Sequence, residues 1–318
     1  MVRIARELIA AARTGVNEVF CVFDRSLRTL APFDAFTVWE LCGDRFTCTY
    51  TSGGRYEHYA GVSVSAFAAG SPLGEVRRRG RELFVESPLL PLHPADRVAL
   101  AMPLDDLPLV AYSALRERPH RLQLHELLEA AAIAAPAIAL ARDRAYDRMS
   151  ATYDGLTGLL TPRAFRAELG ERLRQAPLVR SAPRIALVFL DTDRFKEWND
   201  RYGHAAGDEL LRRLAAMLRA HAQGPGDLVA RNGGDEFCLV WADCEKSSAI
   251  VRAEALREAV AAAFAAEPIP ITASIGVAAF PVDARTVEQL LEAADAAMYD
   301  AKRAGRNRIA FAEASICG

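Results

Sequence analysis

The clearest hydrophobic pattern lies in the second half of the chain. Residues 185–190 form a continuous apolar run, Ile-Ala-Leu-Val-Phe-Leu, which predicts a strand buried on both faces. Strand-like residues 229–231 and 237–241 flank an Asn-Gly-Gly-Asp turn, and this pattern predicts a β-hairpin because asparagine and glycine tolerate positive φ. A further strand is expected over 269–277. Helical patterns are expected at 161–174, 193–202, 207–222 and 246–265, and from the capping box Thr286–Gln289 to Gly305.

The first half alternates helical and strand-like segments. An amphipathic helix is expected over 2–12, and a short helix over 71–80 that ends at glycine. The alternation predicts two hairpins and one isolated short strand, with strands at 36–41 and 45–50, 98–102 and 109–115, and 82–86. We therefore expect an antiparallel-sheet domain in this half.

A single long helical pattern over 123–153 joins the two halves. Pro136 lies inside it and has no backbone N–H, so we expect a kink or a boundary at this point. A coiled-coil spacing along this helix is weak. The predicted organisation is a domain over 1–145, the end of the connecting helix over 146–153, and a second domain over 154–313.

Composition and charge exclude several classes of protein. The 39 Lys and Arg residues balance 41 Asp and Glu residues, which argues against a nucleic-acid partner. The longest uncharged apolar run, residues 130–141, is shorter than the roughly 20 residues that span a bilayer. The charged N-terminus has no signal-peptide core, and the six cysteines show no CxxC or zinc spacing. We expect a cytoplasmic protein with no membrane association.

Three carboxylates follow the predicted strands. Asp191 closes the buried strand, and Asp235 with Glu236 follows the glycine pair Gly233-Gly234. If the hairpin lies beside that strand, the three carboxylates converge at one sheet edge. Carboxylate oxygens suit Mg²⁺, and the glycines leave room for a ligand to approach the backbone.

Lysine is rare in this chain, which makes its positions informative. Two of the three lysines are Lys196 and Lys302, and Arg306 lies one helical turn beyond Lys302 on the same face. Together these cations could neutralise a polyphosphate, and a metal with a cationic clamp suits phosphoryl or nucleotidyl transfer. Taken singly, acidic turns and basic helix ends are more often solvated surface features.

The joint pattern is far more specific. Residues 233–237, Gly-Gly-Asp-Glu-Phe, resemble the signature of the GGDEF family, the diguanylate cyclases. The neighbouring motifs agree, at 154–159, 189–200, 202–208, 273–277 and 297–307. The resemblance covers roughly 150–313 and implies a palm-like α/β domain similar to nucleotide cyclases and polymerases.

The resemblance implies a metal site and a catalytic pair. Mg²⁺, with Mn²⁺ as an alternative, would be held by Asp191, the carbonyl of Thr192 and Glu236. Asp235 and Glu236 are the expected catalytic residues. Asp235 would either join the metal site or deprotonate the attacking 3′-hydroxyl, and the sequence leaves that choice open.

The same resemblance implies how the substrate is bound. Asn199 and Asp208 would read guanine, and the phosphates would be held near Gly233 and Gly234 by Lys196, Lys302 and Arg306. Asp208 favours GTP, because a branch of the family that makes mixed cyclic GMP-AMP has serine there. Each domain would bind one GTP, so a homodimer is needed for two 3′-hydroxyls to attack two α-phosphates, forming cyclic di-GMP and two pyrophosphates.

Two alternatives to the cyclase fit these residues less well. A catalytically silent receptor for GTP or cyclic di-GMP is disfavoured because the acids and phosphate ligands are retained. A bifunctional cyclase–phosphodiesterase is not expected from the length.

The RxxD product-inhibition motif of many family members reads Gly224-Pro225-Gly226-Asp227 here, so we expect weak product inhibition.

Residues 1–145 resemble a GAF domain more loosely. The resemblance rests on 71–74 leading to 82–85, on 101–104 and on the helix 127–142. It implies a sensory and dimerisation module that responds to an unknown small-molecule or protein signal and regulates the cyclase through the connecting helix. The expected fold class is therefore α/β (α+β), with a GAF-like antiparallel-sheet domain followed by a palm-like GGDEF domain.

Overall fold

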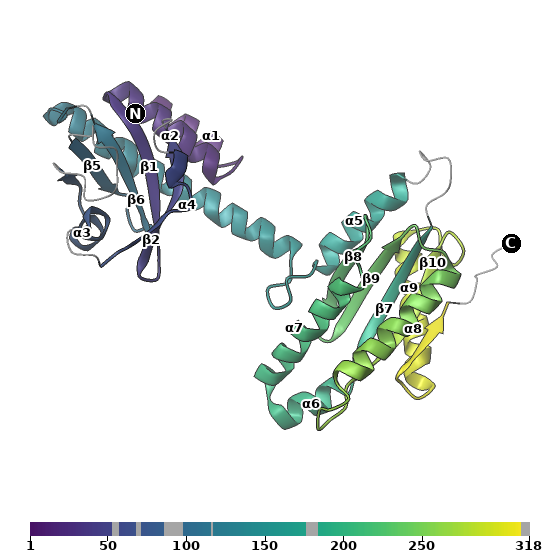
Figure 1. Cartoon of the computed structure of the whole chain (residues 1–318). Helices are drawn as coiled ribbons and strands as arrows, with labels where there is room; N and C mark the ends of the chain where they lie inside the picture. Colours follow the sequence, from purple (N-terminus) through teal and green to yellow (C-terminus); the bar gives the residue numbers. More distant parts are fainter. Residues whose placement is uncertain (53–56, 68–70, 86–97, 116, 176–183, 313–318) are drawn as a thin grey trace. The chain divides into compact units, whose positions relative to one another are not determined.

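The chain folds into two compact units, Met1–Asp147 and Arg148–Gly318 (Figure 1). The structure is a computed structural model that describes residues 1–52, 57–67, 71–85, 98–115, 117–175 and 184–312. Glu86 and Glu313, which end a predicted strand and the predicted second domain, lie outside the described residues.

A six-stranded antiparallel sheet forms the centre of the first unit. Its strand order is β3-β2-β1-β6-β5-β4. The bounds are β1 (Phe33–Cys42), β2 (Arg45–Ser52), β3 (Ser63–Ser65), β4 (Leu83–Val85), β5 (Val98–Pro103) and β6 (Leu109–Leu115). Both predicted hairpins are confirmed, as β1–β2 and β5–β6.

Helices cover both faces of this sheet. One face packs against α1 (Val2–Ala11), α2 (Val16–Leu30) and α4 (Arg121–Thr152), and the other against α3 (Pro72–Arg79) and η1 (Glu57–Tyr59). The helix α2 was not predicted from the sequence, although Val19, Phe23 and Leu27 are all buried and recur at the four-residue helical spacing.

The connecting helix α4 runs without a break from Arg121 to Thr152, so, of the kink or boundary predicted at Pro136, the boundary is wrong. Pro136 cannot donate to the carbonyl of Ala132, but both residues are exposed, and water can satisfy that carbonyl. The break therefore costs too little to end the helix.

Among the described residues, α4 is the one helix long and apolar enough to cross a membrane by length and composition. The twelve-residue apolar run did not predict this. Of its most apolar stretch, 44% is buried in the structure, and side chains such as Leu127, Ala134 and Ile138 belong to the core of the first unit. The buried side of α4 therefore packs within the first unit.

The second unit has a five-stranded sheet with β7 at its centre. The strand order is β11-β10-β7-β9-β8, and all pairs are antiparallel except β10 with β11. The bounds are β7 (Ile185–Asp193), β8 (Leu228–Gly233), β9 (Glu236–Ala242), β10 (Thr272–Phe280) and β11 (Arg308–Phe311). Every residue of β7 is buried, as its continuous apolar run predicts.

Two helical layers cover this sheet. One contains α6 (Phe195–Tyr202), α7 (His204–Ala220) and α8 (Lys246–Ala263), and the other contains α5 (Pro162–Gln175) and α9 (Val287–Arg303). The predicted capping box at the start of α9 is confirmed, because Thr286 Oγ1 accepts from the amide of Gln289. On β10, a Cβ at Gly276 would lie 2.0 Å from the carbonyl oxygen of Ala294, so only glycine lets α9 pack this closely.

Candidate active site

The hairpin β8–β9 lies beside β7, as the sequence predicts, and its turn meets the end of that strand. Asp191 is directly opposite Glu236 on β9. The amide and the hydroxyl of Thr192 both donate to the carbonyl oxygen of Asp235, at 3.2 and 3.1 Å. These contacts bring the four residues expected to hold the metal to one end of the sheet.

The three carboxylates of Asp191, Asp235 and Glu236 lie at this end of the sheet but do not form a compact set of metal ligands. Among the described residues, no three Asp, Glu, His or Cys side chains are grouped closely enough to hold a metal ion. The expected convergence at one sheet edge is present, since Asp235 and Glu236 both repel Asp191, but the three carboxylates do not by themselves complete a metal site. Any metal there would also need backbone, water or substrate oxygens.

Asp191 is nearly buried and carries an ion pair. Lys302, at the end of α9, places its Nζ 2.6 Å from Asp191 Oδ2. Burial raises the pKa of Asp191 to about 6, with repulsion from Asp235 and Glu236 adding to the rise, although Lys302 opposes it. Burial also raises the pKa of Asp235. The site therefore holds more negative charge than Lys302 neutralises, which favours a cation.

Arg231 holds the turn between β8 and β9 in place. Its Nε and Nη2 both donate to the carbonyl oxygen of Gly234, at 2.9 and 2.7 Å, and its Nη1 lies 3.2 Å from Asp154 Oδ1. Asp154 also accepts from the amide and the hydroxyl of Thr157. No role for Arg231 was predicted from the sequence, although its partner Asp154 belongs to the motif at 154–159.

Asn199, the predicted guanine reader, has a free acceptor. Its Oδ1 is buried and makes no hydrogen bond within the described part of the chain. A Cβ at Gly207 would lie 1.9 Å from that atom, so the glycine on α7 makes room for the amide. Asp208 follows directly on α7 and is half-buried. The structure thus brings the two predicted base-reading residues to the facing parts of α6 and α7.

The predicted phosphate ligands differ in their surroundings. Lys196, in the first turn of α6, and Arg306, in the turn after α9, are exposed, and neither has an ion-pair partner among the residues that the structure describes. Lys302 is instead engaged by Asp191. Lys196 and Arg306 are therefore free to bind phosphate directly. Lys302 must first leave the Asp191 carboxylate to do so.

Asp227, the remaining residue of the product-inhibition motif, is used inside the fold. Its side chain is 1% exposed, and it accepts from the amides of Ala242 (2.9 Å) and Gly224 (3.0 Å) and from Arg252 (3.4 Å). A Cβ at Gly224 would lie 3.0 Å from both Asp227 carboxylate oxygens. The carboxylate of Asp227 thus closes its own turn. The absence of the motif's arginine at position 224 is consistent with this structural role.

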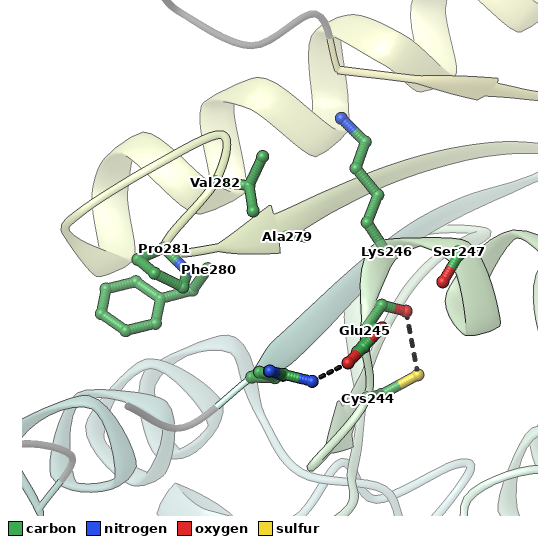
Figure 2. A pocket seen from close by; sticks show the side chains of 9 residues that line it. Cys244, Glu245, Lys246, Ser247, Ala279, Phe280, Pro281 and Val282 are labelled. Carbon is green, nitrogen blue, oxygen red and sulfur yellow. Dashed lines mark hydrogen bonds and ion pairs between the residues drawn. The ribbon is translucent and has the colours of Figure 1, made fainter. Parts of the chain in front are cut away.

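The third lysine, Lys246, lies at the other end of the sheet. It borders a pocket of about 350 Å³ lined also by Cys244 and by residues 279–282 (Figure 2). Its Nζ donates to Asp283 Oδ1 at 2.6 Å and to the carbonyl of Ala312 at 2.7 Å. Lys246 therefore joins β11 to the turn after β10 and has a structural role.

Comparison with known proteins agrees with this arrangement. Residues 151–308 match the family model described as "Diguanylate cyclase, GGDEF domain". The second unit belongs to the GGDEF family. The expected resemblance of this half is thereby confirmed.

Two curated relatives share this domain. The bifunctional diguanylate cyclase/cyclic di-GMP phosphodiesterase MucR of Pseudomonas aeruginosa is 41% identical over 170 residues, which are 52% of this chain and 24% of MucR. Diguanylate cyclase DgcM of Escherichia coli is 40% identical over 162 residues, 50% of this chain and 38% of DgcM. The chain thus spans well under half the length of these relatives.

A solved structure extends the likeness beyond the domain. The coiled coil and GGDEF domain of DgcB from Caulobacter crescentus, in complex with c-di-GMP, is 29% identical with a TM-score of 0.51. The match covers 61% of this chain and all of that one. The fold of the second unit is therefore that of a GGDEF domain.

Proposed function

We propose that this protein is a diguanylate cyclase, which condenses two GTP molecules into cyclic di-GMP and two pyrophosphates. The observation that carries the proposal is the convergence of Asp191, Thr192 and Glu236 at the end of β7 within a GGDEF domain. The supply of GTP favours a cytoplasmic enzyme.

The base would be read by Asn199 and Asp208. The free, buried Oδ1 of Asn199 can accept from a guanine N–H, and Asp208 can accept a second hydrogen bond from the same edge. Adenine presents a different donor pattern on its corresponding edge, so the pair favours GTP over ATP.

The donor set suits Mg²⁺, with Mn²⁺ as an alternative. Asp191, the carbonyl of Thr192 and Glu236 offer only oxygen ligands. Burial, with repulsion from Asp235 and Glu236, raises the pKa of Asp191, and a divalent cation would favour its carboxylate form. When bound, the ion would offset charge on the triphosphate. Lys196, Lys302 and Arg306 would hold the remaining phosphate oxygens.

The reaction forms a bond between a 3′-oxygen and an α-phosphorus and breaks the bond from that phosphorus to the leaving pyrophosphate. It happens twice per product, and each 3′-hydroxyl loses a proton. Asp235, whose pKa is raised by burial, can take such a proton or complete the metal site. Because one domain binds one GTP, two copies of the chain must face each other.

The first unit would regulate this step as a GAF-like module. The helix α4 is anchored to its sheet by an ion pair between Arg142 and Glu40. At the other end, the carbonyl of Thr152 accepts from the amide of Thr161. Directly after α4, Asp154 is bound by Arg231, which also holds the Gly234 carbonyl. A small-molecule or protein signal could thus reach the turn that carries Asp235.

The alternative is a receptor that binds GTP or cyclic di-GMP without turnover. Not every relative is named as a cyclase, since NbdA of Pseudomonas aeruginosa, 34% identical over 166 residues, is named a cyclic di-GMP phosphodiesterase. The retained acids and the internal role of Asp227 favour the enzyme over the receptor.

Product identification tests the proposal. The full chain is incubated with Mg²⁺ and equimolar GTP and ATP, and the products are identified by mass. Cyclic di-GMP as the main product, absent with Glu236→Gln, supports it. Mixed cyclic GMP-AMP contradicts the assignment of Asn199 and Asp208. No product from the full chain or from residues 150–318 fused to a dimerising segment contradicts the enzyme.

A further inference from the structure

Asp193 is a second buried acid on β7, and nothing in the proposed chemistry uses it. Its side chain lies two residues beyond Asp191, and the residue is 2% exposed. Its Oδ1 accepts from the hydroxyl of Ser274 (2.7 Å), and its Oδ2 accepts from the hydroxyl of Thr272 (2.7 Å) and the amide of Asn307 (3.0 Å). One carboxylate thus connects β7, β10 and the turn after α9.

That turn has an unusual backbone. Gly305, Arg306 and Asn307 have φ of 118°, 61° and 45°. Two of the three are not glycine, and left-handed conformations cost such residues energy, so the surroundings must hold them. From outside the turn, the Arg306 amide donates to the carbonyl of Ala301 on α9 at 3.1 Å. Asn307 is held by the Asp193 carboxylate on its amide and by Arg257 Nη1, 2.8 Å from its side-chain oxygen.

The two acids of β7 hold the two ends of this turn. Asp191 binds Lys302 in the last turn of α9, and Asp193 binds the amide of Asn307. Because alternate residues of a strand point to the same face, the two carboxylates are arranged side by side. Arg306 lies between the two attachment points, so its backbone position is set relative to the proposed metal site.

We infer that Asp193 is a positioning residue, which fixes the turn so that Arg306 faces the nucleotide phosphates. The inference rests on the proposed function, in which Arg306 binds phosphate. Asp193 itself has its oxygens occupied by three donors and does not contact substrate.

Binding of 3′-deoxy-GTP, which lacks the attacking hydroxyl, tests the inference apart from turnover. The Kd in Mg²⁺ is measured by calorimetry on the full chain for the wild type, Asp193→Ala, Arg306→Ala and the double variant. We expect each single variant to raise the Kd about 10-fold, and Asp193→Ala to add less than about threefold in the Arg306→Ala background. Multiplying effects, or an unchanged Kd in Asp193→Ala, overturn the inference.

Two further variants separate positioning from stability. Asp193→Asn keeps an acceptor for the Asn307 amide while its NH₂ donates to the Ser274 hydroxyl, so it should restore the Kd to within about threefold of wild type. Ser274→Ala removes one bond to Asp193 but leaves the turn attached, so it should lower Tm without changing the Kd. A weakened Kd in Ser274→Ala equal to that of Asp193→Ala overturns the inference.

Two controls keep the result interpretable. If Asp193→Ala does not fold, Asp193→Ser replaces it, because its hydroxyl is too short to reach the Asn307 amide. A wild type that binds 3′-deoxy-GTP but makes no cyclic di-GMP from GTP contradicts the proposed function alone, while the double-variant comparison still decides the role of Asp193.

Discussion

Lys302 Nζ lies 2.6 Å from Asp191 Oδ2, so a proposed phosphate ligand neutralises a proposed metal ligand. The pair stands at the junction of α9 and β7, where Asp191 is nearly buried and Lys302 is 28% exposed. Binding of a metal–nucleotide complex would exchange these partners, with the metal on the carboxylate and the lysine on a phosphate. Substrate and metal binding should therefore be coupled through this one contact.

The exchange predicts a large effect of removing the lysine. Lys302→Met should lower kcat/KM for GTP by about 100-fold, since a phosphate ligand is lost and Asp191 is left without a cation. Arg303→Met, on the same helix at an exposed position, is the matched control and should stay within about threefold of wild type. Steady-state kinetics of both variants check this, and equal losses would contradict it.

The raised pKa of Asp191 predicts a pH-dependent stability in metal-free protein. Its pKa is about 6 in the folded state against 3.8 as the reference value, so the folded state binds the proton more tightly. The wild type should therefore lose stability relative to Asp191→Asn as pH rises through this interval, by up to about 3 kcal/mol. Below pH about 4 the two proteins should differ least.

Urea unfolding in EDTA at several pH values between about 4 and 7.5 measures that difference. Adding Mg²⁺ at the upper end should stabilise the wild type more than Asp191→Asn. A stability difference that does not change with pH would show that Asp191 ionises normally in the fold.

Gly207 predicts a specific defect in guanine binding. An alanine Cβ there would lie 1.9 Å from Asn199 Oδ1, so Gly207→Ala should displace the amide and raise the KM for GTP about 10-fold or more. Gly170→Ala is the matched control, because its Cβ would meet only Val287 at 3.8 Å on another helix. Activity and Tm of both variants check this, and an unchanged KM in Gly207→Ala would contradict the assignment of Asn199.

The internal role of Asp227 predicts weak product inhibition through that site. Its carboxylate accepts two backbone amides and Arg252, and position 224 has no side chain to offer a ligand. Initial rates should therefore be insensitive to cyclic di-GMP at micromolar concentration. If cyclic di-GMP inhibits the wild type strongly and Gly224→Ala keeps that inhibition, the product binds at another site. If Asp227→Asn abolishes a strong inhibition, the prediction is contradicted.

Local patterns were sufficient for most of the elements. The apolar run of β7, the Asn-Gly-Gly-Asp turn and the Thr286 capping box all depend on neighbouring residues, and the structure has each of them. What failed or fell short depends on surroundings. The helix boundary predicted at Pro136 is absent because water can reach the Ala132 carbonyl, and the three carboxylates at the sheet edge are not grouped closely enough to hold a metal by themselves.

By itself, the sequence determined the residue types of the site, the hairpin that carries the signature and the family of the second half. Only the tertiary structure paired Lys302 with Asp191, left Asn199 Oδ1 without a donor above Gly207, and bound Asp193 to the amide of Asn307, 114 residues away. Spacing along a chain encodes periodicity and turns, which act over a few residues. The distance between two side chains far apart in sequence is decided when the sheet pairs and the helices pack, and the electrostatics of this site depend on those distances.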